Sequence, residues 1–192
     1  MKLRIMLVDA DPQRMDLLMD TLQEAGHWVA TCGDETGNLC EHVHEIQPDV
    51  IIIGTDSPTR DTLEHLCVID RDEPRPVVMF THDNDAQKMR AALRAGVSAY
   101  IVNGLTGSRV QSIIDIAIAR FEEYQALKNE LEKATATLAE RKQIERAKGF
   151  VMKQRGCSEE DAYKMMRKMA MNSNKKMAEI ADNINTAADI FS

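Results

Sequence analysis

The sequence AERKQIERAKGFVMKQRGCSEEDAYKMMRKMAMNSNKKMAEIADNI, residues 139–184, contains three short helical patterns separated by residues that end helices. The first pattern stops at Gly156, since glycine readily adopts the left-handed conformation that closes a helix. The second opens at Ser158, whose hydroxyl can cap the backbone N–H of Asp161. Residues 172–174 interrupt the periodicity before a third helix begins. Each pattern carries one apolar stripe, so the three helices can close one small core.

The charge of this stretch differs from that of the rest of the chain. Between Arg141 and Lys176 there are eleven Lys or Arg residues against four acids, a balance of +7 in a chain whose total is −7. Such asymmetry is typical of a module that binds a polyanion. Lys and Arg on helices are also commonly just solvated. Charge by itself leaves both interpretations open.

Small, basic and apolar residues recur at fixed spacing across all three helices: Arg141, Ile144, Ala147, Lys148, Gly149, Met152, Gly156, Ala162, Tyr163, Arg167, Ala170, Met171, Ala178, Ile180 and Ala181. This pattern resembles the ANTAR domain, the RNA-binding module of the AmiR and NasT transcription antiterminators. The resemblance implies a three-helix domain that binds, as a dimer, paired hairpins in leader mRNA and prevents a terminator from forming. RNA polymerase would be affected only indirectly, through the transcript.

Cationic side chains at the ends and outer faces of these helices are the predicted RNA contacts, and a small residue beside them would permit close approach. We predict contacts at Arg141, Lys148, Gly149, Arg167, Lys175 and Lys176. Aromatic groups are scarce here, only Phe150 and Tyr163, and Phe150 is expected in the core. We therefore expect recognition by loop shape and hydrogen bonding rather than by stacking.

Residues 3–102 alternate short apolar runs with amphipathic helical stretches. The runs are expected as strands at residues 3–8, 28–32, 50–53, 77–80 and 99–102. Strands that are apolar throughout and separated by helices predict a parallel sheet covered on both faces, a doubly wound flavodoxin-like α/β fold. In such folds the chemistry gathers at the carboxyl ends of the strands.

The motifs LVDADP (7–12), PDVIII (48–53), FT (80–81) and AGVSAYI (95–101) resemble the receiver domain of bacterial response regulators. In that family two acids hold Mg²⁺, an Asp accepts a phosphoryl group, and a hydroxyl and a Lys complete the site. Asp9 and Thr81 match two of these positions. Gly54 occupies the phosphoacceptor position and cannot be phosphorylated, and Asn103 occupies the Lys position.

We predict from these departures a pseudo-receiver that aspartyl phosphate does not switch. The alternative is a phosphorylation-dependent receiver in which Asp56 accepts the phosphoryl group in a shifted geometry, although transfer depends on precise placement. Ala10 replaces the second acid, and Asp11 follows it. Asp9 and Asp11 could hold a weak Mg²⁺ site or simply be solvated; no other cofactor or metal is expected.

A long helix is predicted from Arg109 to Gln154, where no proline occurs. The apolar residues Tyr124, Leu127, Leu131, Ala134 and Leu138 alternate intervals of three and four, which is typical of a coiled coil. We predict a homodimer through this seam; the alternative is an amphipathic helix packed on its own sheet domain. The predicted domains are residues 1–107 (receiver-like), 108–138 (coiled-coil linker) and 139–192 (three-helix ANTAR domain).

Several functional classes are not indicated. There is no glycine-rich phosphate loop after the first strand, and no Ser, His or Cys constellation suggests a nucleophile, so we expect no enzyme. No run approaches the roughly 20 apolar residues of a membrane span. The four cysteines show neither zinc spacing nor a disulfide framework, and a cytoplasmic protein is expected. They are Cys32, Cys40, Cys67 and Cys157.

Residues 54–58 and 99–105 look most similar to NasT-type regulators of nitrate and nitrite assimilation. That resemblance implies a nitrate-sensing partner, similar to a periplasmic binding protein but cytoplasmic, which sequesters the regulator until ligand releases it. Two other classes stay open. One is a DNA-binding response regulator that places a basic helix in a major groove, and the other is an interaction adaptor without salt-dependent nucleic-acid binding.

Overall fold

The computed structural model describes residues 2–33, 39–104 and 106–190 of the 192-residue chain. Leu105, the last residue of one stretch compared with NasT-type regulators, lies outside the described residues. The chain forms two compact units, residues 1–125 and 126–192. Helix α5 (Gly107–Arg155) contributes to both units and continues without interruption past residue 138. The domain boundaries expected after residues 107 and 138 therefore stay predictions.

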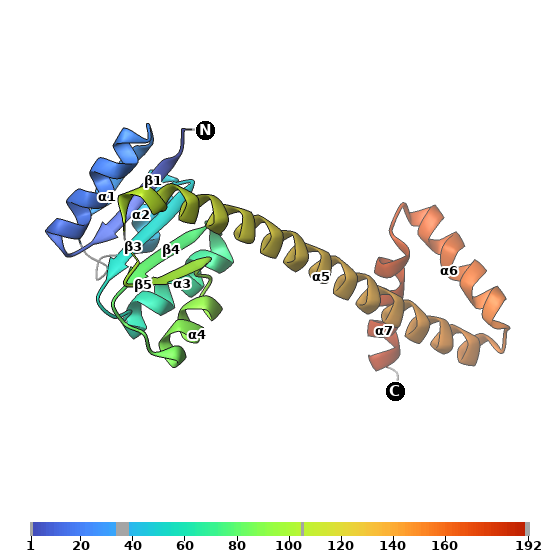
Figure 1. Cartoon of the computed structure of the whole chain (residues 1–192). Coiled ribbons are helices and arrows are strands. Elements are labelled where there is room, and N and C mark those ends of the chain that lie inside the picture. Colours follow the sequence, from blue (N-terminus) through green and yellow to red (C-terminus); the bar gives the residue numbers. More distant parts are fainter. Residues whose placement is uncertain (1, 34–38, 105, 191–192) are drawn as a thin grey trace. The chain divides into compact units, whose positions relative to one another are not determined.

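The N-terminal unit is built round a parallel sheet, which in the described part of the chain has five strands in the order β2-β1-β3-β4-β5 (Figure 1). Almost every residue of β1, β3 and β4 is buried, which is why these strands are apolar along their whole length. The strands are β1 (Arg4–Asp9), β2 (Trp28–Cys32), β3 (Val50–Thr55), β4 (Val77–Thr81) and β5 (Ala99–Val102). The doubly wound α/β fold predicted from the sequence is confirmed.

Helices cover both faces of this sheet. One face packs against α1 and the beginning of α5, whose Leu18 and Ile114 are fully buried. The other face packs against α2, α3 and α4 through residues such as Val43 and Leu66. The helices are α1 (Pro12–Glu24), α2 (Leu39–Ile46), α3 (Arg60–Asp72) and α4 (Ala86–Arg94). All carboxyl ends of the strands therefore meet at one edge.

Short polar side chains determine where the helices after that edge begin. Asp11 accepts a hydrogen bond from the Gln13 N–H at 2.8 Å and so caps α1. Thr59 and Asp85 cap α3 and α4 in the same way. A cap satisfies N–H groups that have no partner within the helix. Strand β3 extends to Thr55, two residues beyond its predicted end, because these residues still pair with β4.

The C-terminal unit closes one small core between the end of α5, α6 (Glu159–Ser173) and α7 (Met177–Ile190). Gly156 ends α5 with a positive φ of 61°, and Ser158 caps α6, as the sequence predicts. The core consists of Ala147, Met166, Ala170, Ile180 and Ala181. The long helix and the three-helix arrangement are thus confirmed. None of the helices in the described ranges combines the length and apolar character of a membrane span.

Candidate functional site

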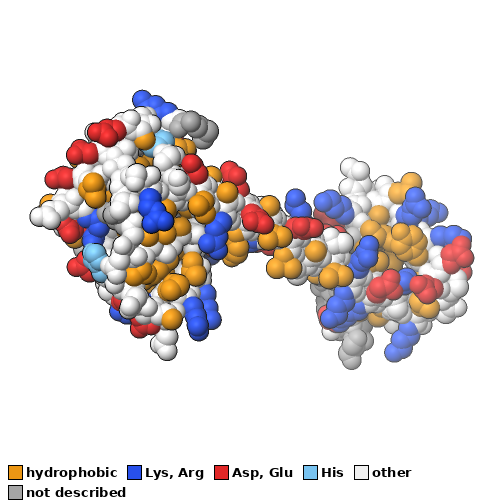
Figure 2. Space-filling model, in the orientation of Figure 1, with side chains coloured by type: hydrophobic (Ala, Val, Ile, Leu, Met, Phe, Trp, Pro, Cys, Tyr) orange, Lys and Arg blue, Asp and Glu red, His pale blue; other side chains and the backbone are white. Residues whose placement is uncertain are grey.

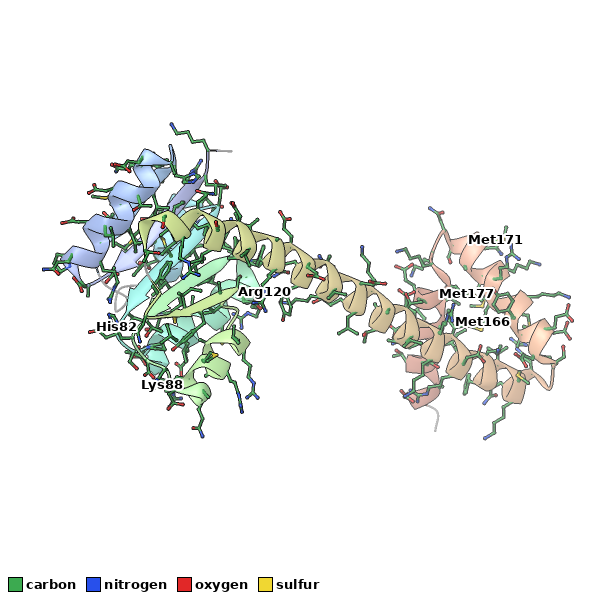
Figure 3. The ribbon with its side chains drawn as sticks, viewed as in Figure 1. His82, Lys88, Arg120, Met166, Met171 and Met177 are labelled. Atoms are coloured by element: carbon green, nitrogen blue, oxygen red, sulfur yellow. The ribbon has the colours of Figure 1, made fainter. Side chains whose placement is uncertain are left out.

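An open cavity of about 470 Å³ lies where α6 turns into α7. Three of the predicted contact residues, Arg167, Lys175 and Lys176, line this cavity together. Figure 3 labels two residues of its wall, Met171 on α6 and Met177 on α7. The remaining lining residues are Tyr163, Ala170 and Asn174. We call this cavity and its lining the α6–α7 corner.

Backbone hydrogen bonds place the two lysines at this corner. Asn174 ends α6 in the left-handed conformation, with φ 50° and ψ 41°, which asparagine tolerates better than most residues. The Lys175 N–H donates to the Ala170 carbonyl at 3.0 Å. The Lys176 N–H donates to the Glu179 carboxylate at 2.8 Å, which starts α7 in the manner of a capping box. Both lysine side chains are left exposed.

The cations of the corner carry uncompensated charge. Within residues 2–33, 39–104 and 106–190, Arg167, Lys175 and Lys176 form no ion pair. Lys164, in contrast, lies on the same helix and pairs with Glu160 at 2.6 Å. Three neighbouring positive charges that are not held in ion pairs raise the local potential and attract an anionic ligand. The corner is therefore the strongest candidate anion-binding surface of this unit.

Lys148 has a different environment from the other predicted contacts. Its side chain is only 10% exposed, and its ammonium lies 2.6 Å from Glu145 and 2.7 Å from Glu159. Hydrogen bonds to Glu145 and then Glu159 raise the pKa of Lys148, and the same contact lowers the pKa of Glu159. Lys148 thus links α5 to the beginning of α6, and its charge is already neutralised within the chain.

Arg141 and Gly149 lie exposed on α5, and neither lines the α6–α7 corner. A Cβ atom added at Gly149 would meet no atom within 4 Å. Glycine inside a helix costs about 0.5–1 kcal/mol relative to alanine. No contact within the described chain therefore requires glycine there, which fits the predicted approach of an outside group.

A separate apolar cavity of about 660 Å³ lies in the same unit. It is lined by Phe150, Val151, Gln154, Arg155, Met165, Met166, Met169, Ile184 and Ala187. Phe150 thus faces an apolar cavity, whereas Tyr163 faces the basic one. Figure 2 shows hydrophobic side chains exposed on the visible face of this unit, with Lys and Arg side chains around them. The two aromatic residues considered from the sequence therefore have opposite surroundings.

At the sheet edge of the N-terminal unit, Asp9 is neutralised by an arginine that the sequence reasoning missed. The Arg14 guanidinium donates to both oxygens of the buried Asp9, at 2.6 and 2.9 Å, and to Asp56 at 3.2 Å. Hydrogen bonding to Asp9 raises the pKa of Arg14 against the opposing effect of burial. The sequence feature that could have predicted this ion pair is an arginine in the first turn of the helix that follows Asp9. A cation already contacts the carboxylate that would hold Mg²⁺.

Glycine at position 54, the predicted phosphoacceptor position, leaves room for this ion pair. Asp9 and Gly54 lie opposite each other on neighbouring strands. A Cβ at position 54 would lie 1.7 Å from the Asp9 carboxylate and 2.8 Å from the Arg14 guanidinium. Such separations are far below contact distance, so any side chain there would displace the pair.

The other residues predicted to belong to a degenerate receiver site take part in local hydrogen bonds. The Thr81 hydroxyl donates to the Asp56 carbonyl at 2.9 Å, while the Asp56 carboxylate is largely exposed. The Asn103 side chain accepts from His82 at 2.6 Å. Asp11 caps α1 rather than facing Asp9 with its carboxylate. Among the described residues, no group of three or more His, Cys, Asp or Glu could hold a metal ion.

A lysine does lie near this edge, but on α4 and already paired. Lys88 contacts Asp83 and Ser57, each at 2.7 Å. Hydrogen bonds from Lys88 and then Ser57 hold the pKa of Asp83 well below its usual range. Figure 3 labels Lys88 and His82 on this side of the N-terminal unit. The cation therefore stabilises the loop after β4.

The predicted dimerisation residues on α5 form an uncovered apolar seam. Tyr124, Leu127, Leu131 and Leu138 are between 54% and 68% exposed. Their spacing places them along one side of the helix. Large apolar groups are normally buried, and a row of them on one helix commonly marks a contact surface.

Two protein families match this chain: "Response regulator receiver domain" over residues 5–115 and "ANTAR domain" over residues 132–184. Among curated proteins, the transcriptional regulatory protein PdtaR of Mycobacterium tuberculosis is 32% identical over 172 residues, covering 88% of this chain and 82% of that protein. The nitrate regulatory protein of Klebsiella oxytoca is 38% identical over 71 residues, 37% of this chain and 18% of that protein. The DNA-binding response regulator MtrA of Mycolicibacterium smegmatis is 25% identical over 126 residues, 66% of this chain and 55% of that protein.

Solved structures share the fold of the N-terminal unit. A CheY-like receiver domain protein from Methanospirillum hungatei superimposes with a TM-score of 0.56 at 19% identity, covering 65% of this chain and 99% of that one. CheY4 of Vibrio cholerae gives a TM-score of 0.53 at 19% identity, covering 61% of this chain and 99% of that one. At this identity the likeness shows the fold alone.

A substitution at Gly54 tests whether the ion pair between Asp9 and Arg14 packs against this residue. We expect Gly54→Ala to lower the free energy of unfolding by about 2 kcal/mol or more, since the new methyl group must displace Asp9 or Arg14. Gly33→Ala is the matched control, because a Cβ there meets no atom within 4 Å. It should change stability by less than about 0.5 kcal/mol. Urea unfolding followed by circular dichroism measures both; equal effects would contradict the packing described here.

Proposed function

Because the chain belongs to the response regulators that carry a C-terminal ANTAR domain, we propose that it is an RNA-binding transcription antiterminator acting on hairpins in leader mRNA. The observation that carries the proposal is the α6–α7 corner, where Arg167, Lys175 and Lys176 are exposed and unpaired within the described chain. The phosphates of an RNA loop provide the anions that such a group attracts. Its role is regulatory rather than catalytic.

The position of these cations favours a hairpin loop over duplex DNA. A helix that reads a major groove presents several contact residues along its own length. Here Lys164 on α6 is paired with an acid, while Lys175 and Lys176 lie at the turn between two helices and line one cavity together with Arg167 of α6. An unstacked nucleotide of a hairpin loop can enter an open cavity of this kind, whereas a base paired within a duplex cannot leave its stack as readily. The match to MtrA, a DNA-binding response regulator by name, makes duplex DNA the necessary comparison.

Two copies of the chain pair through the α5 seam in this proposal. Tyr124, Leu127, Leu131 and Leu138 supply the apolar surface, which the single chain leaves exposed. Association of two copies buries this surface, and burial of apolar area is favourable by roughly 25 cal/mol per Å². The dimer brings two α6–α7 corners to one transcript, so that paired hairpins are bound together.

The receiver-like unit is a pseudo-receiver in this proposal. Gly54 has no group to phosphorylate, and Arg14 already neutralises Asp9 where a metal ion would be needed. Asp56 is exposed and contacts the same guanidinium at 3.2 Å, which opposes its use as a shifted acceptor. A weak Mg²⁺ site at Asp9 and Asp11 would have to displace Arg14. Control of RNA binding therefore comes from another input.

That input, we propose, is a cytoplasmic nitrate-sensing partner, similar to a periplasmic binding protein, which sequesters the regulator until nitrate releases it. The support is the 71-residue match to the nitrate regulatory protein of Klebsiella oxytoca. The genes controlled are then those for nitrate and nitrite assimilation. The regulator itself has no membrane step in this scheme.

RNA binding is tested by titrating the full chain with a two-hairpin leader RNA and with duplex DNA of equal charge at several salt concentrations. We expect the RNA to bind more tightly. Arg167→Ala and Lys175→Ala should each weaken RNA binding by about 5-fold to 10-fold and reduce the salt slope by about one, because each removes a phosphate contact.

Lys168→Ala is the matched control for charge. Lys168 is exposed on α6 but does not line the α6–α7 corner, so its removal should leave RNA affinity nearly unchanged. Equal losses for Lys168→Ala and Lys175→Ala would mean that the corner has no special role. Equal affinity for RNA and DNA would argue for the DNA-binding alternative.

Sedimentation of the isolated chain tests both the seam and the pseudo-receiver. We expect a dimer that acetyl phosphate with Mg²⁺ leaves unchanged, and a monomer for Leu131→Glu, because a buried carboxylate without a partner is costly. Glu132→Gln, a change beside the seam, should remain dimeric. A phosphoryl group detected on Asp56 by mass spectrometry, or a dimeric Leu131→Glu variant, would refute the corresponding proposal.

The sensor is tested by affinity capture with the full chain from cells grown without nitrate. We expect a ligand-binding protein to be retained and then released by adding nitrate. Chloride at the same concentration is the control for ionic strength, which weakens charge contacts in general. Equal release by both salts, or no retained protein, would contradict nitrate control.

A further inference from the structure

Tyr163 is an exposed aromatic residue in a basic cavity. It is 46% exposed, and within the described ranges its hydroxyl has no hydrogen-bond partner. An exposed tyrosine ring contributes little to the stability of this small helical unit, because its core is formed by other residues, mainly alanine and methionine. Its place in the wall of the α6–α7 corner therefore calls for a ligand rather than a packing role.

The lining of the corner combines apolar and positively charged side chains. Tyr163, Ala170, Met171 and Met177 provide apolar surface, whereas Arg167 and the two lysines provide positive charge. Tyr163 and Arg167 are four residues apart on α6 and so lie on the same side of that helix. Ala170 is small and buried, so it takes up little space in the lining. Its volume of about 470 Å³ falls within the roughly 300–1,000 Å³ typical of small-ligand sites.

A nucleotide complements both kinds of lining residue, the apolar and the positively charged. Its base is a flat, mostly apolar ring with polar edges, and the phosphates on either side are anionic. Unstacked bases in RNA loops commonly stack on Tyr or on an Arg plane. Asn174 stands at the turn with an exposed amide that offers both a donor and an acceptor to a base edge. A helix from another protein would be better matched to the larger apolar cavity beside Phe150.

We propose that the α6–α7 corner is a base pocket, in which one unstacked loop nucleotide of the RNA stacks on Tyr163 while Arg167, Lys175 and Lys176 contact the flanking phosphates. The inference rests on the proposed RNA-binding function and adds the part of the RNA that is recognised. It replaces the expectation that stacking has little part in recognition. Tyr163 is thus a specificity residue, and the cations supply affinity for any RNA.

The test uses the full chain, the two-hairpin RNA, and a set of RNAs in which each loop nucleotide in turn is abasic. Tyr163→Leu removes the ring, and Tyr163→Phe keeps it. On the intact RNA we expect Tyr163→Leu to weaken binding by about 10-fold or more and Tyr163→Phe to bind as the native chain does, because stacking needs the ring and not the hydroxyl. The salt slope should stay unchanged for Tyr163→Leu and fall by about one for Lys175→Ala.

The series of abasic RNAs tests whether Tyr163 contacts the base of one particular loop nucleotide. At the recognised position, loss of the base should weaken binding by the native chain about 10-fold and leave Tyr163→Leu unaffected, since the same contact is already missing. If every abasic RNA binds the native chain equally well, the base pocket is refuted whatever the variants do. If Tyr163→Leu binds normally while Lys175→Ala is weakened, the base pocket is likewise refuted and RNA binding through phosphates stands. Absence of RNA binding by the native chain would overturn the proposed function itself.

Discussion

Helix α5 has to bury apolar side chains in two separate cores, and each unit of the chain is built against one part of it. Near its start, Val110, Ile114 and Ala117 complete the core on one face of the sheet. Near its end, Ala147 is fully buried between α6 and α7. Between these parts the same helix exposes a row of large apolar residues. One continuous helix therefore contributes to two cores and leaves an apolar seam exposed between them.

The edge of the sheet holds an internal ion pair at the place where the strand ends meet. A parallel sheet brings Asp9, Gly54 and Thr81 to one edge whatever reaction is carried out there, because the strand ends meet at that place. With glycine at position 54, the Arg14 guanidinium can reach both oxygens of Asp9. Asp9 thus receives its cation from within the chain. A buried carboxylate needs such a partner, since an unpaired buried charge is strongly unfavourable.

The cations of the C-terminal unit fall into two groups. Some form internal ion pairs that support the fold, and others are available to a ligand. Lys148 is buried between two glutamates and holds the beginning of α6 against α5. Arg146 pairs with Asp189, and so links α5 to α7. The cations of the α6–α7 corner have no such partners in the described chain. An anion bound at the corner therefore gains attraction without first breaking an internal ion pair, which is the condition for a useful binding surface.

The sequence by itself determined the features that depend on neighbours along the chain. Apolar periodicity predicted the strands and the long helix, and Gly156 and Ser158 predicted where α5 ends and α6 begins, because caps and stripes are local properties. The three-dimensional arrangement decided which lysines are free. Lys148 and Lys175 look alike in sequence, but only folding brings Glu159 to Lys148, and only the left-handed turn at Asn174 turns Lys175 outward. Packing likewise decided the contact between Arg14 and Asp9 and the exposure of Tyr163. Burial and ion pairing depend on residues distant in sequence, or on the rotamers that the surrounding fold selects.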